Sequence, residues 1–547
     1  MKKIVALFAL AAVTISSCKK SDLQLNNPNS PTPTEALTAQ KGIENFALGM
    51  WNKLYVGNNL LAHTLVMHSI MGDEQFSSVG NFGWRYVNQT DYITIPAPYN
   101  RKIRNPLELS QPAQLKALNT LPATNGSATN AIVYEWNMAY YVNGQANLLL
   151  QTLNAGVVTL PATEKAVLTA WAYWWKGFAY SRIGSMYVSG VITNSTDGST
   201  SPVYVDRNAI INEANSNFDK AAAALTPIAA SDAVYATTMN IIIPTFNRTN
   251  PMVSPAMWVR GINTLKARNL MVNKKVSQMT AADWATVKTL TSAGLIAGDR
   301  TFVLGMDPGG VNDLTPNSQQ HPYGWNSNKN NPGWVFPSER WIQDFKAGDQ
   351  RFTKGVTAFA ANEVVQNRSS RGLQYGTRYY LTAIENGGYW STNNRSGQVQ
   401  FAGSYEENAL MLAEANIRTG DLSGGLALID QVRTANGAGL SAVAGAGLSQ
   451  AQALEELRSE RRIALTYRGL AFYDARRWNI TAPVSAGGGR ANANVVVPNS
   501  VIGTTPAAGW TLLPCLIEYN YMDYWDVPVT EFSYNVPDPS SAPIVAN

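Results

Sequence analysis

The segment from Glu460 to Ile480, ERRIALTYRGLAFYDARRWNI, constrains the fold more than any other part of this chain. Six arginines lie between Arg458 and Arg477, and they alternate with apolar and aromatic residues at helical spacing. Gly469 interrupts this pattern, which indicates that one helix ends and a second begins there. The segment therefore predicts a charged helical hairpin with an aromatic seam.

Charged residues in and before this hairpin are spaced so that they can form ion pairs. Glu455 precedes Arg458 by three residues, and Asp474 precedes Arg477 by three, so each pair can meet on a helix surface. A charge run is usually a solvated or ion-paired face, which favours a structural role for the hairpin. Its expected packing anchors are Phe472, Tyr473 and Trp478.

The composition is that of a globular protein and does not indicate nucleic-acid binding. Of the 547 residues, 45% are hydrophobic and 14% are charged. The formal charge of +5 falls to +3 if residues 1–17 are removed, because Lys2 and Lys3 leave with them. A charge this small favours neither nucleic acid nor an anionic surface as a partner.

The N-terminus has the layout of a secretory signal. Lys2 and Lys3 precede an apolar run from Ile4 to Ile15, which is too short to span a bilayer. Residues 1–17 are therefore predicted to be a lipoprotein signal peptide that ends before Cys18. Residues 18–35 are polar and rich in Pro and Asn, which predicts a flexible tether.

Helical periodicity covers much of the remaining chain. Apolar residues recur at three and four positions between Ala36 and Leu61. Aromatic residues follow helical spacing over 130–153 and 163–188, where a stripe is more often core than binding surface. The further predicted helices are His63–Met71, 207–225, 256–274 and a helix pair over 405–436.

Small and apolar residues of the 405–436 pair lie at offsets typical of tetratricopeptide repeats. We therefore predict a mainly α fold, a helical (tetratricopeptide-type) repeat scaffold with long loops and a few short strands. Helical periodicity mostly disappears over 298–403, and 72–100 and 482–510 are expected to be loops. We divide the folded part into an N-terminal region, 36–290, and a C-terminal region, 291–547.

The chain lacks the common catalytic motifs. It has no Walker loop, H-E-x-x-H pair, C-x-x-C or G-x-S-x-G, and Gly437–Ala442 fits G-x-G-x-x-A but follows a helix. Acidic pairs occur at Asp73/Glu74 and Asp523/Asp526, but adjacent acids usually do not form a glycosidase site. His63, His68 and His321 show no metal-ligand spacing and are expected to be structural. We predict no catalytic residue, no metal and no cofactor.

Two aromatic loops are the candidate ligand site. Neutral sugars have apolar C–H faces and polar edges, so rings with nearby amides suit them, and exposed loops are better candidates than core helices. The first loop, FGWRY, lies between Asn81 and Asn88, and the second runs from Tyr323 to Trp334. The predicted ligand contacts are Trp84, Tyr86, Tyr323, Trp325 and Trp334.

The hairpin resembles the C-terminal signature of the SusD/RagB family of outer-membrane nutrient-binding lipoproteins, E-R-R-x-E-L-x-x-E-G-x-R-x-x-D-L-R-R-W. Ala464 and Arg468 replace the two acids of the signature. The segment from Asp526 to Asn535 resembles the closing segment of the family, and the residues before Cys18 resemble a lipobox. The matching hairpin residues are Glu460, Arg461, Arg462, Leu465, Gly469, Asp474, Arg476, Arg477 and Trp478.

This resemblance implies a non-enzymatic protein anchored through acylated Cys18 to the surface of a Gram-negative outer membrane. It implies that the protein binds an oligosaccharide and delivers it to a SusC-like TonB-dependent transporter. A peptide ligand is the alternative within this class. A surface glycoside hydrolase, or a scaffold that binds no ligand, is the alternative from another class.

Overall fold

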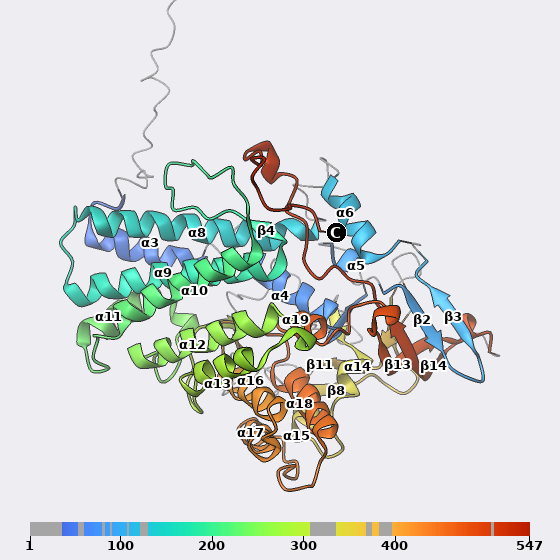
Figure 1. Ribbon diagram of the computed structural model, residues 1–547. Coiled ribbons are helices and arrows are strands. Elements are labelled where there is room, and N and C mark those ends of the chain that lie inside the picture. Colours follow the sequence, from blue (N-terminus) through green and yellow to red (C-terminus); the bar gives the residue numbers. More distant parts are fainter. Residues whose placement is uncertain are drawn as a thin grey trace, which may run out of the picture.

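The computed structural model describes residues 36–52, 60–78, 83–87, 90–106, 109–120, 130–306, 335–367, 373, 375–381, 397–504 and 508–546. Long helices dominate these residues, and the strands between them are few and short. Figure 1 shows stacked helices on the left and a small sheet at the opposite end, made of β2 (Tyr92–Ile95), β3 (Arg101–Arg104), β13 (Arg490–Pro498) and β14 (Trp510–Glu518). The predicted mainly α scaffold with long loops is confirmed.

Most of the stacked helices pack in chain order, whereas α11 packs against α3 and α9. α9 packs against α8 and α10, α10 against α12, α12 against α13, and α13 against α16, which also contacts α17 and α18. This arrangement confirms the helices predicted from periodicity. The stack contains α3 (Gln40–Asn52), α8 (Ala131–Ala155), α9 (Ala162–Met186), α10 (Arg207–Leu225), α11 (Ala233–Ile242), α12 (Pro255–Val272), α13 (Ala281–Ser292), α16 (Tyr405–Arg418), α17 (Leu422–Ala435), α18 (Gln450–Ala464) and α19 (Ala471–Arg477).

Side-chain caps fix where these helices begin. The Asp206 carboxylate accepts hydrogen bonds from the first backbone N–H groups of α10, and the Ser404 hydroxyl accepts one at the start of α16. Ser449 and Gln452 form a capping box at the start of α18. The helix boundaries therefore follow from local sequence as well as from packing.

An aromatic cluster forms the centre of the stack. Trp171 of α9 lies 6.1 Å from Trp51 of α3, 6.0 Å from Trp258 of α12 and 5.5 Å from Phe302, measured between ring centroids. All three tryptophans are buried, which confirms that the aromatic stripe of residues 163–188 is core. Three helices distant in sequence thus share one packing centre.

The remaining elements are the helices outside the stack and the strands. Five two-stranded ribbons and one four-stranded sheet, β13-β14-β2-β3, occur among the described residues. The helices outside the stack are α4 (Leu60–Met71), α5 (Trp84–Val87), α6 (Gln111–Thr120), α14 (Glu339–Ile342), α15 (Gln350–Gly355) and α20 (Asn499–Ile502). The strands are β1 (Gln75–Ser77), β2 (Tyr92–Ile95), β3 (Arg101–Arg104), β4 (Ser189–Gly190), β5 (Val205–Asp206), β6 (Val303–Met306), β7 (Val335–Pro337), β8 (Val356–Ala358), β9 (Val365–Gln366), β10 (Gly376–Thr377), β11 (Tyr379–Leu381), β12 (Gly397–Gln400), β13 (Arg490–Pro498) and β14 (Trp510–Glu518).

Two segments expected to be loops contain regular structure. Residues 482–510 include β13, which pairs antiparallel with β14, so the loop prediction was wrong there. The Val495–Val497 run has high strand propensity and is buried, and this outweighs the Gly-rich residues before it. Residues 72–100 likewise contain β1, α5 and β2. Those elements are too short for periodicity to identify.

Candidate functional site

A short ribbon connects the bases of the two predicted aromatic loops. Strand β1 pairs antiparallel with β7, with Ser77 opposite Val335 and Gln75 opposite Pro337. The chain therefore leaves β1 at the same end of the ribbon at which it enters β7. The segment that leads to Trp84 and the segment that ends at Trp334 are thus attached side by side.

The first loop contains the short helix α5, which carries two of the predicted ligand residues. The Trp84 side chain is 0% exposed, and its ring lies 5.9 Å from that of His63. Tyr86 is half-buried and packs against the edge of the core. Of these two rings, Tyr86 is therefore the one that solvent reaches.

The other predicted site residues lie outside the described residues. These are the lipidation residue Cys18 and the ligand residues Tyr323, Trp325 and Trp334. Their roles, and those of Trp84 and Tyr86 in binding, stay predictions. The second cysteine, Cys515, is a buried free thiol, and burial raises its pKa to about 11, so it packs as a small apolar residue.

The C-terminal hairpin holds the chain just before β1. Arg462 of α18 donates to the backbone oxygens of Gly72 (2.7 Å) and Asp73 (2.8 Å). A Cβ atom at Gly72 would lie 2.3 Å from that of Ala471, so this approach requires glycine. The signature residue Arg462 therefore positions the base of the first loop.

The turn between α18 and α19 lies where Gly469 predicts it. Gly469 has φ +72°, and a Cβ atom there would lie 2.5 Å from Leu65 Cδ2 on α4. Glycine is thus required both by backbone conformation and by space. The predicted packing anchors Phe472 and Tyr473 are buried behind this turn.

The charge run of the hairpin is a buried ion-pair network. Asp474 pairs with Arg461 (2.9 Å) and with Arg477 (2.7 Å), and Arg477 also pairs with Glu414 (2.6 Å). Glu460 is 0% exposed and pairs with Arg351 and Arg433. The predicted Asp474–Arg477 and Glu455–Arg458 pairs are confirmed, the former buried and the latter at the surface.

Some partners in this network come from outside the hairpin and were not predicted from the sequence. Arg351 and Glu460 are 109 positions apart, and Arg462 and Asp344 are 118 apart. Helical spacing relates residues three or four apart, so it cannot identify such partners. The one available signal was the number of arginines in a segment expected to pack, because a buried arginine needs a carboxylate partner.

The first acidic pair, Asp73 and Glu74, lies at the base of the first loop. The Asp73 carboxylate accepts hydrogen bonds from Arg340 Nη2 (2.7 Å) and Nε (3.0 Å). Although Asp73 is buried, the charge of Arg340 keeps the pKa of Asp73 below its usual range. Burial instead raises the pKa of Glu74 to about 8. Both side chains are buried and bonded within the protein, an arrangement that serves packing rather than contact with a substrate.

The second acidic pair and the histidines also have partners inside the protein. Asp526 accepts from the Ala546 backbone N–H, and Asp523 pairs with Lys275 (2.9 Å). His68 Nε2 lies 3.2 Å from a Glu135 oxygen, and burial lowers the pKa of His68 to about 4. His63 and His68 are structural, as expected, and His321 lies outside the described residues.

Two findings about the described part of the chain concern metals and membranes. Within the described ranges, no group of three His, Cys, Asp or Glu side chains is arranged to hold a metal ion. No described helix is both long enough and apolar enough to cross a membrane.

Comparison with known proteins identifies relatives of this architecture. Residues 405–511, which include α16 to β13, match the model of the SusD family. No curated protein sequence matches the chain. The family match therefore rests on the segment that contains the hairpin.

Solved structures are similar over nearly the whole chain. A SusD-like protein from Bacteroides fragilis is 13% identical, with a TM-score of 0.57 over 91% of this chain and 96% of that protein. A SusD-like carbohydrate binding protein from Bacteroides vulgatus is 14% identical, with a TM-score of 0.54 over 92% and 98%. Surface glycan-binding protein A from Bacteroides uniformis is 14% identical, with a TM-score of 0.50 over 80% and 88%. The TM-scores and coverages establish a shared fold, and at identities this low they establish the fold alone.

Proposed function

Because this chain belongs to the SusD/RagB family, we propose that it is a non-enzymatic, lipid-anchored surface protein that binds an oligosaccharide. It passes this ligand to a SusC-like TonB-dependent transporter in the outer membrane of a Gram-negative cell. Cys18 is the proposed acylation site. Of the three similar structures named above, one is described as carbohydrate binding and one as glycan-binding, which supports a sugar ligand.

The observation that carries the ligand site is the pairing of Ser77 with Val335. Two aromatic segments far apart in sequence are attached to one end of the β1–β7 ribbon, so their rings can contribute to one surface. Phe76 and Phe336 stack at 5.9 Å within this ribbon and are buried, which gives both segments a rigid base.

The proposed ligand contacts are Trp84, Tyr86, Tyr323, Trp325 and Trp334. A sugar lies with its apolar face on such rings while its hydroxyls bond to nearby amides. The buried Trp84 indole reaches a ligand only if the side chains over it move. Tyr86 is the described ring that can contact a ligand without such movement.

Calorimetric titration of residues 19–547 with a panel of oligosaccharides tests this site. We expect saturable binding that Tyr86→Ala and Trp325→Ala each weaken by about tenfold or more, since one stacked ring contributes roughly 1–3 kcal/mol. Tyr534→Ala is the matched control, because Tyr534 is 90% exposed and belongs to the C-terminal segment. Unchanged affinity in both loop variants with an unchanged melting temperature would refute the site.

The same titration separates the alternative functions. Saturable binding of peptides, with silence across the sugar panel, would replace the sugar ligand by a peptide. Release of shorter products from excess oligosaccharide would show turnover and would refute a purely binding role. Absence of binding to every sugar and peptide would favour a scaffold that binds no ligand.

The anchor and the transporter are tested in native membranes. Cys18→Ala should shift the protein from the membrane fraction to the soluble fraction, because one acyl-bearing cysteine is the proposed attachment. Affinity purification of the wild-type protein should recover an outer-membrane transporter. Purification without such a partner would refute the delivery step.

A further inference from the structure

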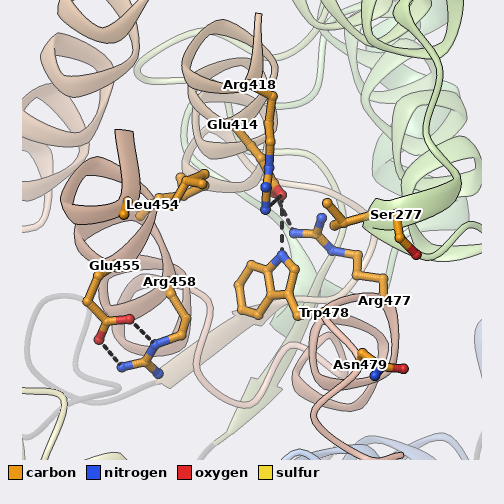
Figure 2. Close-up of a pocket in the computed structure, with 12 residues that line it drawn as sticks. Ser277, Glu414, Arg418, Leu454, Glu455, Arg458, Arg477, Trp478 and Asn479 are labelled. Carbon is orange, nitrogen blue, oxygen red and sulfur yellow. Dashed lines mark hydrogen bonds and ion pairs between the residues drawn. The ribbon is translucent and has the colours of Figure 1, made fainter. Parts of the chain in front are cut away.

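A cavity of about 510 Å³ opens beside the C-terminal hairpin, between α16, α18 and α19. Its volume falls within the range of sites for small molecules. Figure 2 shows the Trp478 indole standing between Arg477 and the Arg458–Glu455 pair, with Arg418 and Glu414 at its upper edge. None of the lining residues comes from α5, β1 or β7, the described elements of the aromatic-loop site.

Trp478 is held in place as a wall of the cavity. Its Nε1–H donates to Glu414 Oε1 (3.2 Å), and the Arg477 guanidinium carbon lies 4.6 Å from the centre of the ring. The indole is only partly buried. A fixed, partly exposed aromatic surface loses little conformational freedom when a flat ligand packs on it.

Arg418 is the lining cation that lacks a carboxylate of its own. Among the described residues its ion-pair partner is Glu414, at 3.7 Å, and that carboxylate is already bound by Arg477 at 2.6 Å. The Arg418 side chain is 27% exposed. Burial, with repulsion from Arg477, lowers the pKa of Arg418 from its ordinary value although Glu414 raises it. Its guanidinium is therefore available to an anionic group.

The other two lining arginines are fully neutralised. Arg477 also pairs with Asp474 (2.7 Å), and Arg458 pairs with both Glu455 (2.6 Å) and Asp344 (2.7 Å). Arg418 is therefore the lining arginine whose positive charge is not balanced by a carboxylate of its own. One carboxylate would balance this charge, whereas a doubly charged phosphate would face both glutamates.

A smaller neighbouring cavity of about 140 Å³ is also cationic but serves the fold. There Arg476 donates to the backbone oxygens of Ser185 and Val272, both 2.8 Å, at the ends of α9 and α12. Arg207 donates to Asn273 at the end of α12. These guanidinium groups balance the partial negative charge at the helix C-termini, so they do not need an anion from a ligand.

We propose that the larger cavity binds one acidic sugar unit, whose carboxylate pairs with Arg418 and whose apolar ring face packs on Trp478. The exposed hydroxyl of Ser277 is placed to bond to the hydroxyls of the sugar. The choice of a sugar rests on the proposed function. The inference that this sugar is acidic rests on Arg418 alone.

Titration with D-glucuronate, and with methyl glucoside as its neutral partner, tests this site. We expect the wild-type protein to bind glucuronate about tenfold more tightly than the neutral sugar, because a charge-assisted Arg–carboxylate pair forms. Arg418→Gln should remove this preference, and Arg418→Lys should keep part of it. Trp478→Phe should weaken the binding of both sugars. Lys354→Gln, at an exposed lysine of α15, is the control and should change the affinity for neither sugar.

The outcomes separate this proposal from the aromatic-loop site. Tyr86→Ala should leave glucuronate binding unchanged even where it abolishes oligosaccharide binding. The proposal is refuted if folded Arg418→Gln binds glucuronate as the wild type does, or if Tyr86→Ala removes that binding. Equal affinity for both sugars refutes the carboxylate assignment, and absence of saturable glucuronate binding refutes the site.

Discussion

Arg340 and Asp73 form a buried ion pair although 267 positions separate them in the chain. Arg340 Nη2 lies 2.7 Å from Asp73 Oδ1, and the Arg340 side chain is 1% exposed. Asp73 has φ +59°, so the same residue makes a sharp turn before β1 and receives the guanidinium from α14. This pair fixes the ribbon from which both proposed ligand loops extend.

Loss of Arg340 should destabilise the protein strongly. Arg340→Met leaves the Asp73 carboxylate buried with weaker compensation, and removing one partner of a buried pair costs roughly 3–5 kcal/mol. We expect the free energy of unfolding, measured by chemical denaturation, to fall by about this amount. The double variant Arg340→Met/Asp73→Asn is the control, and it should lose less than the sum of the two single variants. Additive losses would contradict a direct pair.

Glu74 should make stability depend on pH near neutrality. Burial raises its pKa from 4.5 to about 8, so between these values the folded state holds a proton that the unfolded state releases. The contribution is fully present below pH 4.5 and is lost as pH rises through about 8. The free energy of unfolding should therefore decrease by a few kcal/mol between about pH 6 and pH 9. Glu74→Gln should lack this decrease, and a variant with an unchanged slope would contradict the assignment.

Lys176 should have the opposite effect at higher pH. Its ammonium is buried among neutral oxygens, which include Asn143 Oδ1 (3.0 Å) and Asn194 Oδ1 (2.9 Å), and burial lowers its pKa from 10.5 to about 8. Between these values the unfolded state binds more protons, so stability from this group increases with pH. The difference in free energy of unfolding between the wild type and Lys176→Met should grow from about pH 7 to pH 10 in favour of the wild type. A constant difference would contradict the lowered pKa.

Gly469→Ala should disturb the hairpin turn more than backbone strain alone explains. The added Cβ meets Leu65 at 2.5 Å and also requires φ +72°. Gly420→Ala is the matched control, because Gly420 has φ +96° and nothing within 4 Å of its added Cβ. We expect the control to lose about 1 kcal/mol and Gly469→Ala to lose roughly 1–3 kcal/mol more, measured as unfolding free energy. Equal losses would show that the contact with α4 relaxes freely.

Local sequence predicts the helices and the hairpin well. The Gly469 turn and the Asp474–Arg477 pair depend on residues within a few positions of each other, and both appear as predicted. The four N-terminal stack helices α8, α9, α10 and α12 lie within a few residues of the predicted ranges. Periodicity identifies such elements because each buries one face along its whole length.

Contacts between distant residues could not be predicted in this way. β13 was missed because a strand is defined by its partner, and that partner, β14, begins only after α20. The excess charge of Arg418 depends on how Glu414 is shared with Arg477, which no spacing rule describes. The ribbon that connects the two aromatic loops likewise depends on a pairing between residues of different regions.

The four-stranded sheet sets an order of events during synthesis of the chain. β2 pairs with β14, and Thr94 donates to Glu518, 424 positions later. The β2–β3 hairpin therefore emerges from the ribosome long before its partner strand exists, and one edge of β2 stays unpaired until translation is almost complete. A chain truncated before β14 would keep that edge exposed and would be a substrate for aggregation and proteolysis rather than a smaller folded protein.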